Sequence, residues 1–392
     1  MSKRIITGID IGSHTIRVVI TEYEQGAGLP NILGLGKSES RGLRHGYIIN
    51  LPDAVKSVRL AVDEAERNSG IKIREAFLSV GGVGLEGTQT DGAAIISRAD
   101  SEIAESDVER ALRACETNLM YAANKRNLHT IPISYKIDGK TVFGRPAGMK
   151  GLKLEAKCLI VTCLDQHLND LIRAVEEAGV DVIDACAAPI AASFVALTKA
   201  QRMAGCVLAN IGAETVSIVV YEDNIPISLE VFPIGSTDIT NDIALGLKIP
   251  LEEAESIKLG KGGHQYPRKK LNDIMLSRLE DMFNLVIAHL KKIGKHELLP
   301  AGIVLTGGGS GIETIEDFAR AAMKLPSKIP SINLDFANNP KSKKQIKDTS
   351  WFVAYGLAIW GVTNDRTSRP SGQGLWSRIK ESFGDIVKQL LP

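Results

Sequence analysis

The sequence predicts a two-domain α/β fold with duplicated halves around a cleft, a small α+β insertion in the first half and an amphipathic helix at the C-terminus. Three observations lead to this prediction. A strand–turn–strand pattern in residues 10–20 recurs in residues 210–220. Between residues 83 and 163 the pattern changes to short strands around one helix. Residues 374–392 carry an apolar stripe at helical spacing.

The overall composition narrows the class of protein. The chain has 392 residues, of which 44% are hydrophobic and 24% charged, and its net charge is +1. This length allows two to four domains, and the balanced charge argues against a nucleic-acid-coating role. The five cysteines form no C-x-x-C pair, which argues against a disulfide scaffold or a zinc finger and fits a reducing cytosol.

Alternating apolar residues predict a β-meander at the start of the chain, followed by a helix and a strand. The helix has alanine and valine at helical spacing and ends at Gly70. The predicted elements are strands at 4–10, 15–23 and 31–36, a helix at 52–68 and a strand at 75–80.

The stretch from Gly81 to Val161 reads as an inserted subdomain. Glycine and threonine crowd residues 81–92, and Thr88 to Gly92 reads as a turn. Ser106 is expected to cap a helix at 107–123. Strands are then predicted at 133–137 and 156–163.

A second meander opens the second half at residues 206–234. A helix closed by Gly179, a short strand and an alanine-rich helix precede it. Helices, a strand with a triple glycine and an apolar segment follow it. The predicted ranges are helices at 166–178, 189–197, 236–247, 251–259 and 272–293, strands at 180–184 and 302–306, and the apolar segment at 351–361.

The chemistry of the repeat lies in its turns. Asp10 to Ile20 aligns with Asn210 to Val220, so a polar residue, a glycine and a hydroxyl recur at each hairpin tip. Glycine lets backbone N–H groups approach an anion closely, and two opposed tips can clamp a chain of phosphates. A carboxylate at a tip can hold Mg²⁺ through water. Gly307 to Gly309 follow a strand and form a third candidate loop, although structural turns would explain any one of these features alone.

Together these motifs resemble the actin–Hsp70–sugar kinase superfamily and, within it, the FtsA family of bacterial cell-division proteins. Residues 40–46 and 129–132 and the amphipathic tail favour this family over other members. The resemblance implies two phosphate loops, an adenosine loop, and a ribose and adenine contact in the A-E-x-x-K pattern of residues 254–258. It also implies that 185–197 and 351–361 are the connecting helices at the interdomain hinge.

The resemblance implies ATP and Mg²⁺ as cofactors, with Asp10 as the metal ligand. The implied cofactor-binding residues are Asp10, Gly12, Ser13, His14, Thr15, Asn210, Gly212, Ala213, Glu214, Thr215, Glu255, Lys258, Gly307, Gly308 and Gly309. The implied division of the chain is subdomain 1A at 1–82, 164–205 and 346–362, inserted subdomain 1C at 83–163, subdomain 2A at 206–226 and 300–345, subdomain 2B at 227–299, a linker at 363–373 and the terminal helix at 374–392.

The second phosphate loop departs from the usual D-x-G-G-G-T pattern. Asn210 stands in place of the acid, and Ala213 and Glu214 replace two glycines. An amide does not supply the charge that holds hydrated Mg²⁺ and orients attacking water, and Glu214 is expected to add negative charge near the phosphates. We therefore expect ATP binding with at most weak ATPase activity, and assign no catalytic residue.

An apolar stripe like that of residues 374–392 more often belongs to a helix that packs on the protein's own core. The terminal position, the polar linker before it and Trp376 beside basic residues favour an interfacial membrane helix instead, as the resemblance also implies. The residues expected to enter the membrane are Leu375, Trp376, Ile379, Phe383, Ile386, Val387 and Leu390.

The resemblance implies an actin-like protein that polymerises, recruits other division proteins and tethers FtsZ filaments to the inner face of the cytoplasmic membrane at the septum. The FtsZ C-terminal tail is expected to bind subdomain 2B, and no nucleic acid is expected as a partner. One alternative is an actin-like platform of type IV pilus or secretion machinery, which predicts no free terminal amphipathic helix. A second alternative is a sugar kinase of the same fold, which would need a catalytic acid in the cleft and a sugar site.

Overall fold

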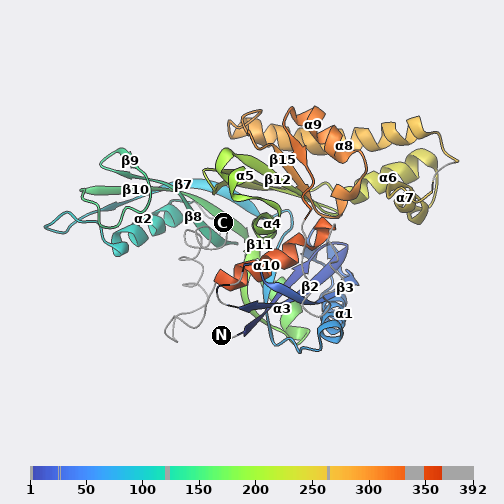
Figure 1. The fold of residues 1–392 in the computed structure, drawn as a ribbon, viewed down its shortest axis with the longest axis horizontal. Coiled ribbons are helices and arrows are strands. Elements are labelled where there is room, and N and C mark those ends of the chain that lie inside the picture. The colour runs from blue at the N-terminus through green and yellow to red at the C-terminus, as the bar shows by residue number, and fades with distance from the viewer. Residues whose placement is uncertain are drawn as a thin grey trace.

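A computed structural model describes residues 3–24, 26, 28–119, 124–262, 265–331 and 348–363. Figure 1 shows two α/β halves, one above the other, with an inserted subdomain extending to one side. Within these residues no helix is long and apolar enough to cross a membrane. The predicted linker from residue 364 onward and the terminal helix at 374–392 lie outside the described residues.

The first half is built on a five-stranded sheet with the strand order β11-β6-β1-β2-β3. Helix α1 covers this sheet and confirms the predicted helix: Asn50 caps its start and Gly70 ends it in a left-handed conformation. The elements are β1 (Lys3–Ile11), β2 (Thr15–Glu24), β3 (Asn31–Glu39), α1 (Leu51–Ser69), β6 (Glu75–Val80), α3 (Asp165–Glu177) and β11 (Asp181–Ala187).

The second half repeats this topology, with the strand order β14-β13-β12-β15-β16. The register repeats as well, because Asp10 pairs with Arg17 across the first hairpin and Asn210 pairs with Ser217 across the second. The predicted duplication is therefore confirmed. The strands are β12 (Cys206–Ile211), β13 (Val216–Glu222), β14 (Ile225–Phe232), β15 (Ile303–Thr306) and β16 (Ser327–Lys328).

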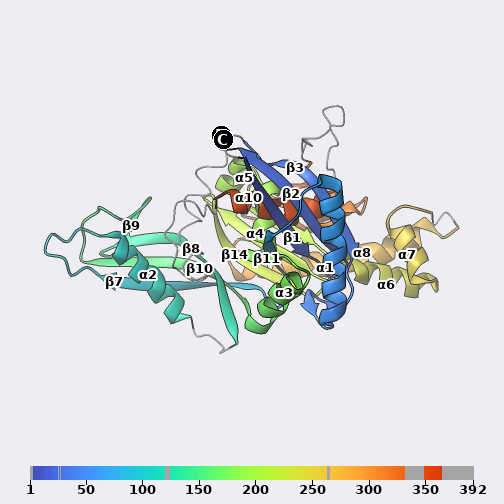
Figure 2. The same ribbon diagram turned by 90° about the horizontal axis from the view of Figure 1, so that it is seen from below.

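Helices pack on the second sheet and extend away from it. Apolar side chains of α8, including Phe283 and Leu290, share a core with β12 and β13. Figure 2 shows α6 and α7 at one end of the molecule and the insertion at the other. The helices are α5 (Lys199–Ala204), α6 (Ser236–Leu247), α7 (Leu251–Lys258), α8 (Arg268–Lys292) and α9 (Ile315–Met323).

The insertion is a four-stranded sheet, β7-β10-β8-β9, with one helix packed on it. Two details of the prediction are wrong. Thr88 to Gly92 belong to a strand that pairs with β10, not to a turn. Helix α2 starts before Ser106, and the amide of Ala104 donates to the Asp107 carboxylate. The elements are β7 (Glu86–Ile95), α2 (Glu105–Asn118), β8 (Lys125–Ile137), β9 (Lys140–Val142) and β10 (Lys153–Leu164).

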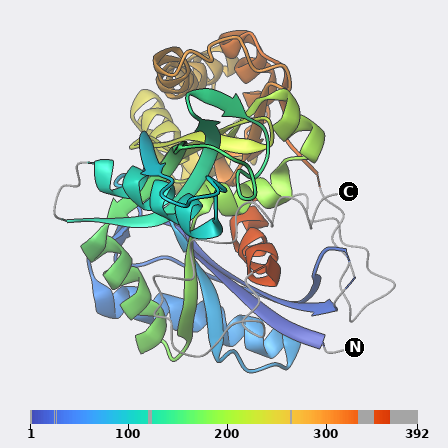
Figure 3. The same ribbon diagram turned by 90° about the vertical axis from the view of Figure 1, so that its left-hand side faces the viewer.

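Two apolar helices, α4 (Ala188–Ala196) and α10 (Phe352–Thr363), lie between the sheets. Figures 1 and 3 show α10 between the halves. The helices pack on each other, while α10 contacts β1 and β2 and α4 contacts β12 and β13. Their close approach requires Gly356, because a Cβ there would lie 1.9 Å from the carbonyl oxygen of Ala191. The pair therefore joins the halves at one fixed position.

Candidate functional site

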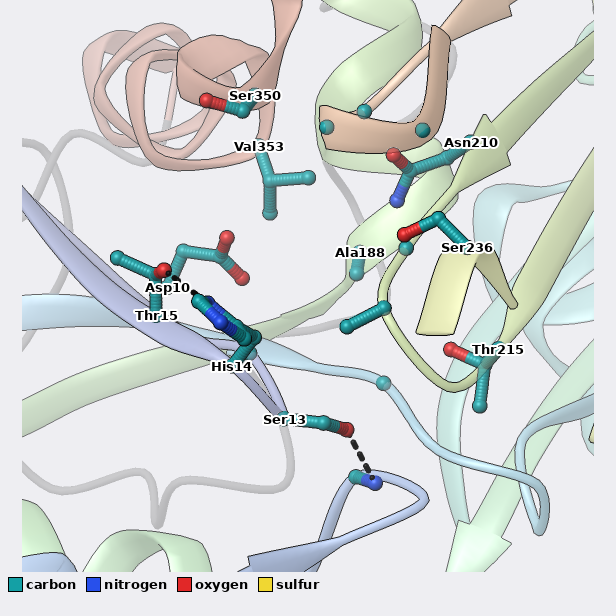
Figure 4. A pocket seen from close by; sticks show the side chains of 18 of the residues that line it. Asp10, Ser13, His14, Thr15, Ala188, Asn210, Thr215, Ser236, Ser350 and Val353 are labelled. Atoms are coloured by element: carbon teal, nitrogen blue, oxygen red, sulfur yellow. Dashed lines mark hydrogen bonds between the residues drawn. The ribbon is translucent and has the colours of Figure 1, made fainter. Parts of the chain in front are cut away.

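A pocket of about 220 Å³ lies between the two halves. Figure 4 shows Asp10, Ser13 and His14 of the first half facing Asn210, Thr215 and Ser236 of the second. All the cofactor-binding residues that the sequence predicted line this pocket except Glu214. The structure thus brings together segments that lie far apart in the chain, from Asp10 in β1 to Gly309 in the turn after β15.

The tips of the two repeated hairpins form opposite walls of the pocket. In the second tip the amide of Gly212 donates to the Thr215 carbonyl over 2.8 Å. The amides of Ser236 and Thr237 donate to the carbonyls of Gly212 and Ala213, over 2.9 and 2.8 Å. These bonds hold the second tip against the start of α6, whose helix dipole places partial positive charge beside the pocket.

Asp10 is the acid at the first tip. Its carboxylate accepts a 2.7 Å hydrogen bond from the Ser79 hydroxyl. Burial raises the pKa of Asp10, while the Ser79 hydrogen bond and the charge of Arg17 oppose this rise. One carboxylate suits Mg²⁺, which is held by one or two protein carboxylates together with phosphate oxygens and waters. The described residues contain no group of three His, Cys, Asp or Glu that could hold a metal ion.

Two cations line the pocket. The Lys258 ammonium lies 2.6 Å from the Glu255 carboxylate and donates to Thr240 Oγ1 over 2.9 Å. This pairing lowers the pKa of Glu255 against the opposing effect of its partial burial. The guanidinium of Arg17 lies 5.8 Å from the centre of the Trp351 ring, which is a cation–π distance. Lys258 is thus already paired with an acid, while Arg17 adds a positive charge to the pocket wall.

The triple-glycine loop is a short 3₁₀ turn at Gly308–Gly311, η1, which follows β15. Gly307 has a φ of 85°, and a Cβ on it would lie 2.5 Å from Asn210 Oδ1. Ser310 Oγ and Thr349 Oγ1 donate to the Gly307 carbonyl over 2.8 and 3.2 Å. Gly308 faces open space, since a Cβ there would have nothing within 4 Å. The turn thus leaves room for a ligand beside Gly308.

The structure corrects the expected position of Glu214. Its carboxylate accepts a hydrogen bond from the backbone amide of His45 instead of facing the pocket. Sequence reasoning also missed pocket residues. Arg17 could have been found from the alternation of β2, which places it opposite Asp10. Other missed lining residues include Gly46, Ser79, Gly81, Gly82, Ser236, Thr237, Ser350 and Val353.

The tail predicted to bind membrane adds nothing to this geometry, because it lies outside the described residues. This applies to each residue that was predicted to enter the membrane. These residues are Leu375, Trp376, Ile379, Phe383, Ile386, Val387 and Leu390.

Comparisons with known proteins agree on one family. A family model described as cell division protein FtsA matches residues 207–356, and one described as the SHS2 domain inserted in FtsA matches residues 82–162. The chain is 31% identical to the cell division protein FtsA of Pseudomonas aeruginosa, covering 84% of this chain and 83% of that protein. It is also 31% identical to that of Borreliella burgdorferi, covering 92% and 91%. With that of Escherichia coli K12 it shares 26%, over 99% and 97%.

Solved structures support the fold. The PilM–PilN type IV pilus biogenesis complex matches with a TM-score of 0.68 at 16% identity, covering 91% of this chain and 98% of that chain. MreB5 of Spiroplasma citri bound to ADP matches with a TM-score of 0.51 at 14% identity, covering 92% and 97%. At these identities the likeness establishes an actin-like architecture and nothing more.

Proposed function

The chain belongs to the FtsA family of cell-division proteins, and on that premise we propose that it binds ATP with Mg²⁺ in the pocket between its halves. One observation carries this proposal. Two repeated hairpin tips and the turn at Gly307 to Gly309 line a single pocket, although they come from three distant parts of the chain. Backbone N–H groups at glycine-rich turns bind phosphate oxygens, so the two tips are suited to a chain of phosphates.

In this proposal each part of the pocket has a separate task. The tips at Gly12 and Gly212 bind phosphate oxygens, and Asp10 contributes the protein carboxylate to the metal. The bound Mg²⁺ would neutralise phosphate charge. Glu255 and Lys258 lie where the ribose and adenine contact is expected, and their mutual ion pair fixes their positions. The space beside Gly308 receives the nucleoside.

Isothermal titration calorimetry with ATP, with and without Mg²⁺, tests the proposal. Gly308→Val should abolish binding, because a Cβ there meets no protein atom within 4 Å and the side chain would occupy the open space of the pocket. Gly311→Val is the matched control: it lies in the same turn, also faces open space, and does not line the pocket. If the unaltered chain takes up no ATP, or both variants lose it equally, the pocket is not the nucleotide site.

The same family membership leads us to infer the partners. Its members act in cell division, and we propose that this chain polymerises, recruits other division proteins and ties FtsZ filaments to the cytoplasmic face of the membrane at the septum. The FtsZ tail is assigned to residues 227–299. This segment presents three exposed basic side chains, Arg268, Lys269 and Lys270, at the start of α8.

Fluorescence anisotropy of an FtsZ tail peptide on the full chain tests this assignment. Charge reversal of all three α8 residues to glutamate should weaken binding and reduce its dependence on salt. The control carries the same charge change on exposed lysines of the insertion, Lys136, Lys140 and Lys157. Equal affinity of the α8 variant and the unaltered chain would place the contact elsewhere.

The alternative function is a platform of pilus or secretion machinery, and the PilM–PilN complex shares the fold of this chain with a TM-score of 0.68. That likeness rests on 16% identity, whereas two cell-division relatives share 31% over most of the chain. Sedimentation with lipid vesicles separates the two functions, because only the division protein needs residues 374–392 for membrane binding.

A further inference from the structure

A short hairpin that the sequence analysis did not predict lies at the pocket. It consists of β4 (Leu43–Arg44) and β5 (Tyr47–Ile48), joined by His45 and Gly46. Both turn residues have positive φ angles, 49° and 86°, the backbone conformation of a tight two-residue hairpin. Gly46 lines the pocket, so the tip of the hairpin forms part of its wall.

The hairpin tip is tied to the first phosphate tip. The amide of Gly46 donates to Ser13 Oγ over 2.9 Å, as Figure 4 shows. The tip also packs closely on the chain after β6, because a Cβ on Gly46 would lie 2.5 Å from the Cα of Gly82. These contacts lie within the first half and fix the position of the hairpin relative to Asp10 and Ser13.

The same tip is tied to the second phosphate tip, across the pocket. The backbone amide of His45 donates to Glu214 Oε2 over 2.5 Å. The ring Nδ1 of His45 lies 3.3 Å from the carbonyl oxygen of Glu214, so with its proton on Nδ1 it donates there too. The two residues are 169 positions apart, and the bond from amide to carboxylate joins them whichever tautomer the ring adopts. Hydrogen bonds to a carboxylate are stronger than those between neutral groups.

Further contacts join the halves elsewhere. Beside the pocket, Thr349 Oγ1 lies 2.8 Å from Ser310 Oγ and donates to the Gly307 carbonyl. Ser193 Oγ and Tyr221 OH are 2.6 Å apart where α4 packs on β13, and Gln89 donates to the Ile227 carbonyl between the insertion and β14. Neither pair lines the pocket. Opening the pocket by separating its two phosphate tips therefore requires that the His45–Glu214 bonds break, while contacts at α4 and α10 can remain.

We propose that Glu214 is a positioning residue that latches the β4–β5 hairpin across the pocket and thereby sets the rate at which nucleotide leaves. This inference rests on the proposed function of nucleotide binding. Glu214 does not contact the ligand in this proposal. It holds the hairpin against the second tip, so that bound phosphates are released only after the latch opens.

Two measurements on the full chain test the latch. Hydrogen–deuterium exchange reports the amide of His45 without any nucleotide, and Glu214→Ala should speed exchange in residues 41–50. Stopped-flow release of a fluorescent ATP analogue should become about tenfold faster, as expected for the loss of a charge-assisted hydrogen bond. Glu214→Gln keeps a hydrogen-bond acceptor, so its rates should lie between those of the unaltered chain and those of Glu214→Ala. The control is Glu252→Ala, which removes an exposed acid of α7 and should change neither rate.

Thermal unfolding of each variant shows whether it is folded. If Glu214→Ala does not fold, Glu214→Gln replaces it in both measurements. Unchanged exchange in residues 41–50 would overturn the latch itself. Faster exchange with unchanged nucleotide release would overturn its role as a gate. If the unaltered chain binds no nucleotide, the proposed function and the gate fail together, whereas the exchange experiment still decides whether the contact exists.

Discussion

Asp10 and Asn210 occupy the same register position in the two halves of the chain, each paired with a residue of the following strand, Arg17 and Ser217. The two tips are therefore alike in backbone and different in charge. The first tip has a carboxylate with a guanidinium across the hairpin, and the second has an amide with a hydroxyl. Only the first of the two tips therefore presents a carboxylate at this register position, which bears directly on how fast bound ATP would be cleaved.

We expect ATP hydrolysis well below about 1 per second, the lower end of ordinary enzyme rates. Asn210 cannot accept a proton from water or add charge to a hydrated metal. Asn210→Asp should not reduce the rate, and Asn210→Ala should leave it unchanged. Phosphate release by purified full-length chain with ATP and Mg²⁺ measures this. Turnover at 1 per second or faster would show that another group activates the water.

Asp10→Asn should stabilise the fold while weakening Mg²⁺-dependent ATP binding. Burial raises the pKa of Asp10 above that of the unfolded chain, so its ionised form opposes folding at neutral pH. An asparagine can still accept the Ser79 hydrogen bond of 2.7 Å. Thermal unfolding should show a higher midpoint, and calorimetry should show that Mg²⁺ no longer improves affinity.

Ser79→Ala is the control for this prediction. It keeps the carboxylate and removes its hydrogen-bond donor, so the pKa of Asp10 should rise further and stability at neutral pH should fall. If Asp10→Asn instead lowers the unfolding midpoint, the carboxylate is ionised and well solvated in the folded chain, and the argument from burial is wrong.

Acid should destabilise the chain through buried histidines. Burial lowers the pKa of His289 to about 4, although Glu230 lies 3.6 Å from its Nδ1 and favours the charged form. Between the ordinary value of 6.5 and about 4 the unfolded chain binds a proton that the folded chain does not. Stability should therefore fall with falling pH in this window, by up to about 1.4 kcal/mol per pH unit for this group.

His289→Gln should reduce that slope, because glutamine does not titrate and can still bond to Ser228, whose Oγ lies 2.7 Å from the histidine Nε2. Urea unfolding at a series of pH values between 4 and 7 measures the slope. His296→Gln, a partly exposed histidine beyond the end of α8, is the matched control. Equal slopes for His289→Gln and the unaltered chain would mean that His289 is not responsible. Burial lowers the pKa of His129 as well, to about 3, so part of the slope should remain.

Much of the fold could be predicted from the sequence because its signals are local. The helix at Leu51–Ser69 has an apolar stripe, with a cap at Asn50 and a terminating glycine at Gly70 directly beside it, and Glu75–Val80 is a short, mostly apolar run that is buried on both faces as a strand. The duplication could be predicted because the hairpin tips repeat their residues. Thr88 to Gly92 was mistaken for a turn because Gly92 is required by packing against another element, not by the local backbone. A Cβ there would lie 2.3 Å from the amide nitrogen of Cys115 in α2.

The loops that line the pocket could be predicted from the sequence, but the side-chain contacts between distant segments could not. Residue types at the tips indicated phosphate binding, whereas the direction of the Glu214 side chain depends on a hairpin from the other half of the chain. Nothing within a few residues of Glu214 or of His45 indicates that they meet. Ser79 was missed for the same reason, since it reaches Asp10 only because β6 pairs with β1 in parallel.

The last prediction concerns the terminal helix, which lies outside the described residues. Trp376, Ile379 and Phe383 are spaced i, i+3 and i+7, so on a helix they share one face and can enter the acyl boundary together. Burying one large apolar side chain contributes roughly 1.5–3 kcal/mol, so its loss should weaken vesicle binding by one to two decades.

Phe383→Glu should do more, because it also places a charge in an apolar layer. Gln389→Glu adds the same charge to the polar face and should leave vesicle flotation nearly unchanged, as should high salt, since few net charges face the lipid. Flotation that survives Phe383→Glu but is lost with Gln389→Glu or in high salt would mean that the tail binds headgroups electrostatically, and the amphipathic anchor would be wrong.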